Sequence, residues 1–129
     1  QLESNFAEDG EYPRSLEISS GNLDINHILK ELGTGLYLSN LHYLNWSDPL
    51  NAGITGMTRY ACFWVENGEI VGPIKDLRFD ESLYSLWGTE LEHITHHAEI
   101  EANTGTYFQR QLGGKKVPGM IVNNMNFTL

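Results

Sequence analysis

Two histidines and a glutamate are spaced four residues apart in the second half of the chain, at His93, His97 and Glu101. On a helix this spacing places all three side chains on one face, where two imidazoles and a carboxylate could hold a zinc ion with one open position. Hydrolytic zinc helices also carry a glutamate directly after the first histidine, to polarise the bound water, and Ile94 occupies that position here. The sequence therefore favours solvated surface histidines, with a divergent zinc hydrolase built on these three residues as the weaker alternative.

A second candidate site follows the stretch 52–58, whose two glycines suit close backbone approach or a loop that faces a ligand. Thr55 lies inside this stretch, and Arg59 and Tyr60 come directly after it. A cation beside an aromatic ring can hold a peptide carboxylate or a ring, and the equal alternative is a strand arginine that pairs with a nearby glutamate. The residues predicted to contact a substrate or a partner are Thr55, Arg59, Tyr60 and Trp64.

Packing explains the single cysteine and the tryptophans more simply than a catalytic or ligand-binding role does. Cys62 is predicted to be buried as a small hydrophobic residue, because Arg59 is the only nearby cation that could activate its thiol. Whether this thiol is reactive stays open. Trp46, Trp64 and Trp87 could line a ligand groove, but packing in a core or an interface explains them more simply. One cysteine cannot form a disulfide within the chain, which favours a reducing compartment.

The hydrophobic patterns predict a mixed fold. Apolar residues recur with a period near 3.6 over 23–32 and again over 81–96, which predicts two helices, the first ended by Gly33 and the second capped by Asp80. Alternating segments elsewhere predict strands, and Asn67-Gly68 predicts a tight hairpin turn. The expected fold class is α+β, with a mainly antiparallel and partly barrel-like sheet.

Length and charge limit the possible functions. The chain has 129 residues, which suits one domain, expected over 15–129 after a polar and flexible lead-in over 1–14. Seventeen acidic residues against eight basic ones give a formal charge of -9, which repels nucleic acid and anionic lipid. No apolar run approaches the roughly 20 residues that span a membrane. The start has neither an initiator methionine nor a signal peptide, so a processed chain or a fragment of a longer one is expected.

A series of short motifs resembles a known family. In order along the chain the motifs are Gly33 to Leu38, Thr55-Gly56, Phe63 to Ile70, Pro73-Ile74 and Pro118-Gly119-Met120. Their order and spacing resemble the C-terminal domain of the TldD/PmbA (TldE) proteins, a family described as modulators of DNA gyrase or as peptidases. The resemblance extends from about Leu16 to Phe127, and Phe63 to Ile70 is its most specific part.

The resemblance implies a role in proteolysis. In that family a TldD-type subunit pairs with a TldE-type subunit in a cytoplasmic peptide-cleaving assembly, and the TldD-type chain holds zinc through a His-Glu-x-x-x-His helix and a cysteine near its tail. The present sequence has no His-Glu pair and no cysteine between Leu91 and Pro118, so it is similar to the metal-free TldE/PmbA type.

The expected function is therefore that of a non-catalytic domain, with zinc in a TldD-type partner and a peptide as the substrate of the complex. The expected partner is a TldD-type subunit or a second copy of the chain, without direct contact to nucleic acid. The alternative from another class is a stand-alone module that binds a peptide or a small ligand.

Overall fold

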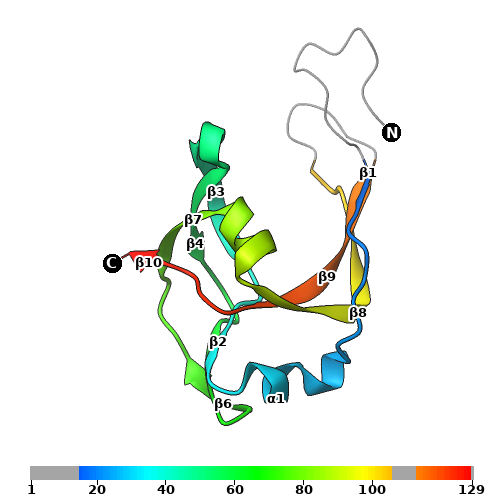
Figure 1. Ribbon diagram of the computed structural model, residues 1–129, viewed down its shortest axis with the longest axis vertical. Coiled ribbons are helices and arrows are strands. Elements are labelled where there is room, and N and C mark those ends of the chain that lie inside the picture. Colours follow the sequence, from blue (N-terminus) through cyan, green and yellow to red (C-terminus); the bar gives the residue numbers. More distant parts are fainter. Residues whose placement is uncertain (1–14, 106–112, 129) are drawn as a thin grey trace, which may run out of the picture.

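The computed structural model describes residues 15–105 and 113–128, which form three sheets and a few helical turns (Figure 1). The strands are β1 (Ser15–Glu17), β2 (Gly35–Tyr37), β3 (Leu41–Asp48), β4 (Gly53–Thr58), β5 (Phe63–Glu66), β6 (Glu69–Pro73), β7 (Arg78–Ser82), β8 (Leu91–Ala102), β9 (Gly114–Val122) and β10 (Phe127–Thr128). The helical segments are η1 (Ile25–His27), α1 (Ile28–Leu32), η2 (Pro49–Asn51) and η3 (Ser85–Thr89). The α+β class and the mainly antiparallel pairing are confirmed, but the sheets stay open and do not close into a partial barrel. The lead-in expected over 1–14 lies outside the described residues.

The longest pairing joins β8 and β9, which run antiparallel from Leu91 opposite Val122 to Ala102 opposite Gly114. β1 adds to the other side of β9 in parallel, so this sheet has the order β1-β9-β8. In Figure 1 these strands stand at the right, while β3, β4 and β7 stand at the left and α1 runs below.

The prediction of a helix over 81–96 is wrong for most of that range. A single wide helical turn, η3, accounts for the start of the apolar stripe and buries Leu86, and from Leu91 onward the chain is the strand β8. Asp80 is likewise a residue of β7, opposite Thr55, and does not cap a helix.

Long-range pairing explains why β8 replaces the expected helix. Thr95 is completely buried, and its hydroxyl donates to the carbonyl of His97 (2.7 Å) and accepts from the N–H of Gly119 (2.8 Å) on β9. This partner lies more than twenty residues further along the chain, so a local periodicity cannot reveal it. Pairing with β9 therefore overrides the helical pattern, as tertiary context commonly does.

The first helix is confirmed, with a small shift at its start. η1 and α1 together run from residue 25 to residue 32, and the carboxylate of Asp24 accepts a hydrogen bond from the N–H of Asn26 (2.9 Å). This cap satisfies a helix-start N–H and fixes where the helix begins. Gly33 ends it with a φ of 65°, the positive value that glycine accepts without strain, and donates to the carbonyl of Leu29 (3.1 Å).

A four-stranded sheet with the order β10-β7-β4-β3 contains the centre of the core. Phe79 on β7 is completely buried opposite Gly56 on β4, where a Cβ atom would come within 2.8 Å of the phenyl ring. Glycine at position 56 therefore lets the phenyl ring lie against the backbone of β4. β3 forms an outer edge of this sheet, and its side chains are mostly exposed.

The third sheet, β2-β5-β6, confirms the predicted hairpin. Asn67 and Gly68 both have positive φ values, 51° and 80°, as a two-residue turn of this kind requires. The N–H of Gly68 donates to the carbonyl of Gly33 (2.7 Å), so the turn is tied to the end of α1. Val65, on the β5 strand of this hairpin, is completely buried.

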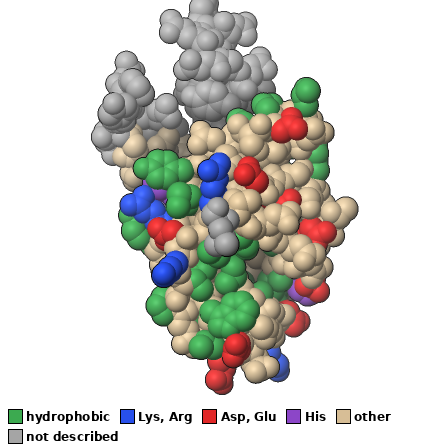
Figure 2. Space-filling model, turned by 90° about the vertical axis from the view of Figure 1, so that its left-hand side faces the viewer, with side chains coloured by type: hydrophobic (Ala, Val, Ile, Leu, Met, Phe, Trp, Pro, Cys, Tyr) green, Lys and Arg blue, Asp and Glu red, His purple; other side chains and the backbone are tan. Residues whose placement is uncertain are grey.

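The described residues bury few large side chains and expose many. The buried hydrophobic residues are Cys62, Val65, Phe79, Leu86 and Ile121. Large exposed hydrophobic residues occur on β3, β6, η3 and β8, and Figure 2 shows such side chains gathered in the lower part of one face. None of the described helices combines the length and the apolar character that crossing a membrane requires.

Candidate functional site

The three residues of the candidate zinc site lie along β8 and not on a helix. His93 and Glu101 are eight residues apart, which is about 26 Å in a regular strand, whereas zinc ligands must all lie within about 2.3 Å of one ion. The carboxylate of Glu101 instead pairs with the ammonium of Lys115 on β9 at 3.2 Å. Within the described ranges no three His, Cys, Asp or Glu side chains gather closely enough to hold a metal ion.

The predicted contact residues Arg59 and Tyr60 do lie together. They begin the loop between β4 and β5, and the guanidinium carbon of Arg59 lies 4.8 Å from the centre of the Tyr60 ring. Tyr60 is mostly exposed and has a φ of 57°, and the next residue, Ala61, also has a positive φ of 29°. Two successive non-glycine residues in this region indicate that the surrounding structure holds the loop in place.

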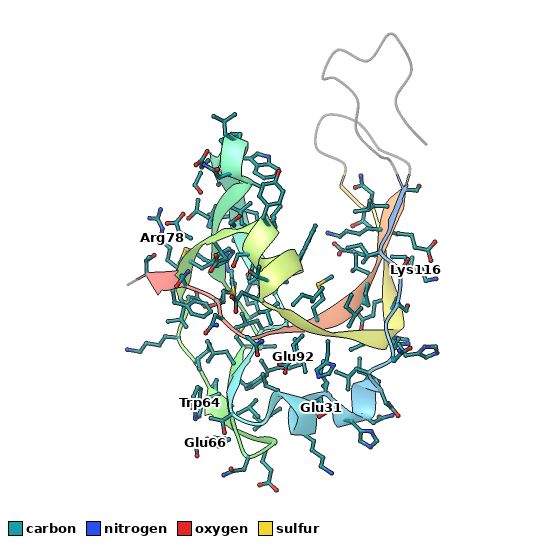
Figure 3. All side chains as sticks on the ribbon, viewed as in Figure 1. Glu31, Trp64, Glu66, Arg78, Glu92 and Lys116 are labelled. Carbon is teal, nitrogen blue, oxygen red and sulfur yellow. The ribbon has the colours of Figure 1, made fainter. Side chains whose placement is uncertain are left out.

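Thr55 and Trp64 lie away from that loop. The hydroxyl of Thr55, on β4, donates to the carbonyl of Phe79 (3.0 Å), so it is used within the sheet. Trp64 lies on β5 in a different sheet, and its indole N–H donates to the carboxylate of Glu66 (2.9 Å). Figure 3 shows Trp64 and Glu66 side by side next to β6. The structure therefore brings together only Arg59 and Tyr60 among the four predicted contact residues.

The cysteine and the tryptophans differ in how well they match expectation. Cys62 is buried, as predicted, and its sulfur lies 3.8 Å and 3.9 Å from the carbonyl oxygens of Arg59 and Asn40. Trp46, Trp64 and Trp87 are all exposed in the described structure, so core packing does not account for them.

An apolar groove separates α1 from the strands β2 and β9. A cavity of about 480 Å³ lies between Ile28 on α1, Leu38 after β2 and Met120 on β9, and His97 and Glu99 of β8 supply polar groups to its lining. A second cavity of about 360 Å³ shares Leu32, Leu36 and Ile121 with the first. The two cavities are therefore neighbours, and we call them together the helix groove.

Glu92 is a charged residue of the helix groove. It lines the smaller cavity together with Leu32 of α1, and Figure 3 shows it between α1 and the β8–β9 pair. An apolar hollow with a few polar groups is the kind of surface that receives a peptide side chain or another chain segment. The helix groove is therefore the best-formed candidate binding surface of the described residues.

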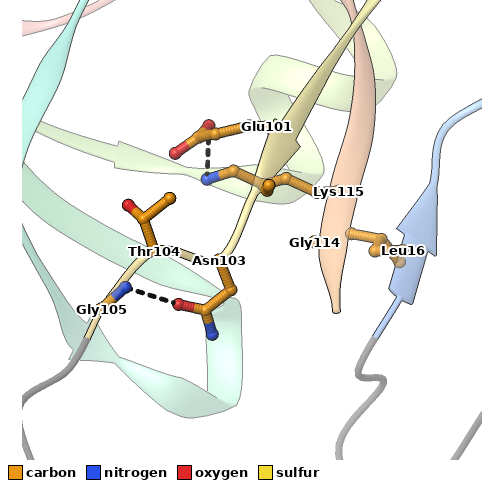
Figure 4. Close-up of a pocket in the computed structure, with 8 residues that line it drawn as sticks. Leu16, Glu101, Asn103, Thr104, Gly105, Gly114 and Lys115 are labelled. Atoms are coloured by element: carbon orange, nitrogen blue, oxygen red, sulfur yellow. Dashed lines mark hydrogen bonds and ion pairs between the residues drawn. The ribbon is translucent and has the colours of Figure 1, made fainter. Parts of the chain in front are cut away.

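A third cavity, of about 470 Å³, lies at the edge of the sheet where β8 ends and where β1 and β9 begin (Figure 4). Its polar lining includes the Glu101–Lys115 ion pair and Asn103, whose side-chain oxygen accepts from the N–H of Gly105 (3.2 Å). Both charged side chains of the pair are more than half exposed, so their interaction is weak. These solvated groups do not form an enclosed site.

Among the described residues, two carboxyl groups have shifted pKa values, and both cap helical turns. The N–H of Asn26 holds the pKa of Asp24 below its usual value, and the side-chain amide of Asn26, His27 and His96 lower it further. The side-chain amide of Asn51 likewise lowers the pKa of Asp48. These shifts favour the charged carboxylates that stabilise η1 and η2, and they do not mark a catalytic acid.

A family model matches residues 10–129, and its description is PmbA/TldA metallopeptidase C-terminal domain. The chain belongs to this family. The resemblance inferred from the ordered motifs is thereby confirmed, and it covers every sheet described above.

Two proteins illustrate the relationship of this PmbA/TldD-family domain to known proteins. It is 32% identical over 75 residues to the Metalloprotease PmbA of Escherichia coli O157:H7, which covers 54% of this chain and 15% of that protein. It also matches the crystal structure of TldE from Thermococcus kodakarensis with a TM-score of 0.70 at 16% identity, over 97% of this chain and 26% of that chain. The second match shows a common fold. The chain thus corresponds to about a quarter or less of the length of these relatives.

The family name implies a metal, and the described residues do not fit one. A catalytic zinc site needs three protein ligands that converge on one position. The histidines of β8 are spread along an extended strand, Glu101 is paired with Lys115, and the described ranges hold no other group of three suitable side chains. No step of hydrolysis is therefore assigned to a metal held by these residues.

The sequence patterns did not reveal the helix groove. The apolar residues of α1, β2 and β9 were each recognised as parts of regular elements, but their common hollow depends on how three distant segments pack. The exposure of β3 was missed for a related reason, because Tyr43, Leu44 and Trp46 suit a half-buried strand equally well. One available signal was the absence of acidic and basic side chains from residues 41–47 apart from His42.

Proposed function

We propose that this chain is a non-catalytic domain of the TldE/PmbA type that completes a peptide-processing metalloprotease heterodimer. A TldD-type partner holds the zinc and activates water, while this chain supplies sheet surface and groove walls. The observation that carries the proposal is the extended geometry of β8, which separates the only histidines that had suggested a metal site. Family membership supports the link to proteolysis.

The helix groove is the surface we assign to contact with the peptide or with the partner subunit. Its lining combines the leucines of α1 and β2 with Met120 of β9, and polar groups lie among them. Such a surface suits an extended segment with apolar side chains and gives no means of cleaving it. We further propose that the chain acts in the cytoplasm without direct contact to DNA, which its charge of -9 and its single cysteine support.

Reconstitution tests the proposal. The purified chain is assayed for cleavage of a fluorogenic peptide alone, with a TldD-type subunit, and with a chelator. We expect cleavage only in the mixture, together with formation of a complex between the two chains. Cleavage by this chain alone, abolished by the chelator and restored by zinc, would instead establish the divergent hydrolase based on His93, His97 and Glu101.

A pair of variants connects the proposal to the helix groove. Met120→Lys places a charge in the groove, and we expect it to lower activity of the mixture or affinity for the partner at least tenfold. Ile70→Lys changes an exposed side chain of the β5–β6 hairpin, outside the groove lining, and serves as the control. Equal activity and affinity for both variants would remove the groove from the proposal.

The stand-alone binding module is the second candidate, and the helix groove is the observation that favours it. Such a module would bind a peptide or a small ligand without taking part in proteolysis. Purification from the native source separates the two functions, because a TldD-type subunit accompanies the chain only in the first.

A further inference from the structure

Asn67 is the only asparagine of the 129 residues that a glycine follows. Its side chain is exposed at the tip of the β5–β6 hairpin, and its carboxamide has no partner among the described residues. An asparagine in this setting is chemically labile, because glycine has no Cβ atom to shield the backbone nitrogen beside the carboxamide. Asn67 is therefore a candidate for spontaneous loss of its side-chain amide.

The reaction needs no enzyme and only water as a co-reactant. The backbone nitrogen of Gly68 attacks the side-chain carbonyl carbon of Asn67, so that a carbon–nitrogen bond forms and closes a succinimide ring. The bond from that carbon to the amide nitrogen breaks, and ammonia leaves with the proton that the Gly68 nitrogen gives up. Water then opens the ring at either carbonyl and leaves aspartate or isoaspartate at position 67.

The folded chain holds the Gly68 nitrogen away from this reaction. Its N–H donates to the carbonyl of Gly33 (2.7 Å) at the end of α1, and the N–H of Asn67 donates to the hydroxyl of Thr34 (3.2 Å). A Cβ atom on Gly68 would lie 3.1 Å from the Cα of Lys30, so the turn lies close against α1 (Figure 1). The nitrogen can lose its proton and turn towards the carboxamide only after its hydrogen bond to Gly33 opens.

We propose that Asn67 is a deamidation site whose rate is set by the contact between the β5–β6 hairpin and the end of α1. While the contact is closed the residue is protected, and each local opening exposes it to the reaction. This inference does not depend on the proposed function.

The product weakens the contact that had protected the residue. Glu66 and Glu69 lie directly opposite each other beside the turn, and a carboxylate at position 67 adds a third negative charge there. Isoaspartate also lengthens the backbone by one methylene group, which the two-residue turn cannot accommodate. Because α1 forms one wall of the helix groove, the reaction is a one-way change at the end of that wall.

Peptide mapping by mass spectrometry tests the proposal on the 129-residue chain. The chain is kept at neutral pH, once folded in buffer and once unfolded in guanidinium chloride, and the aspartate and isoaspartate formed at position 67 are followed over weeks. We expect Asn67 to be the fastest-reacting asparagine in guanidinium chloride and to react at least about tenfold more slowly in the folded chain. Equal rates in the two conditions, faster conversion of another asparagine in guanidinium chloride, or no conversion of Asn67 in either would overturn the proposal.

A pair of threonine variants shows whether the local contact sets the rate. Thr34→Val removes the acceptor of the Asn67 N–H, and we expect it to speed conversion in the folded chain about fivefold without changing the rate in guanidinium chloride. Thr55→Val removes a hydrogen bond to the carbonyl of Phe79 in a different sheet and should leave the rate in the folded chain unchanged. Circular dichroism confirms that both variants fold. Equal acceleration by the two variants would show that global unfolding exposes Asn67, and this result or no acceleration by Thr34→Val would overturn the proposal.

Discussion

At the scale of single residues, the structure depends on buried threonines as well as on its few buried hydrophobic side chains. Thr95 and Thr58 are completely buried, and each satisfies backbone groups of a neighbouring segment. The hydroxyl of Thr58 accepts from the N–H of Leu77 (2.9 Å), which joins β4 to the segment before β7. These hydroxyls link strands at points where the ladder alone leaves backbone groups without partners.

Replacing Thr95 by valine tests this dependence. The change keeps the shape of the side chain but leaves the N–H of Gly119 and the carbonyl of His97 without the hydroxyl. Burial of unpaired polar groups of this kind costs about 1–3 kcal/mol, so we expect that decrease in the free energy of unfolding measured in urea. The control is Thr89→Val on the exposed side of η3, which should stay near the wild-type value. Equal losses in the two variants would contradict the role assigned to Thr95.

The lowered pKa of the helix-capping carboxylate predicts how stability changes with pH. The pKa of Asp24 is lowered in the folded chain, so its contribution is present above the unfolded pKa, near 3.8, and is lost as pH falls through the lower folded pKa. Asp24→Asn keeps a side-chain oxygen but cannot titrate. We expect the gap in Tm between wild type and this variant to be constant above about pH 5 and to shrink towards about pH 2. A gap of constant size across this range would show that the carboxylate does not contribute through its charge.

At the scale of elements, the hairpin of β5 and β6 is the most locally determined part of the fold. Its turn needs a positive φ at Gly68, and a Cβ atom there would also come within 3.1 Å of the Cα of Lys30. Gly68→Ala should therefore lower the free energy of unfolding by about 1–2 kcal/mol, measured by thermal or urea unfolding. Gly72→Ala, on β6 with open space around it, is the matched control and should be nearly neutral. If both variants unfold alike, the turn does not have this role.

The same hairpin shows which elements could be predicted from sequence. Asn67-Gly68 and Gly33 require backbone conformations that few residues accept, so their local chemistry determined the structure there. The stretch after Glu90 contains no such signal, and its apolar residues fit a helix and a strand equally well. Distant partners resolve that ambiguity: β9 pairs with β8 through residues such as Met120 opposite Ile94, and Leu23 bridges to Thr95. Elements set by local chemistry were predictable, and those set by distant partners were not.

The candidate site likewise has parts that the sequence could predict and parts that it could not. The contact between Arg59 and Tyr60 was predictable because the two residues are adjacent in the sequence. The helix groove required knowledge of how α1 lies relative to β2 and β9, and the zinc hypothesis depended on a helix that does not form. Family membership, by contrast, was accessible from the order of short motifs alone.

At the scale of the whole molecule, charge determines which partners can approach. A net charge of -9 is distributed over a surface whose described cations are few, and two of them, Lys115 and Lys116, are already paired with Glu101 and Glu17. We therefore predict no binding to duplex DNA in a fluorescence anisotropy titration at about 150 mM salt. A saturable rise in anisotropy that weakens with added salt would contradict this prediction, because it would reveal a basic surface that the described residues do not form.

The proposed function requires that this chain supplies contact surface and that its partner supplies the metal. The most direct measurement is the metal content of the purified 129-residue chain after incubation with zinc and exhaustive dialysis, by inductively coupled plasma mass spectrometry. We expect zinc far below one ion per chain, with the same value in His93→Ala and His97→Ala. One zinc ion per wild-type chain, lost in either variant, would contradict it.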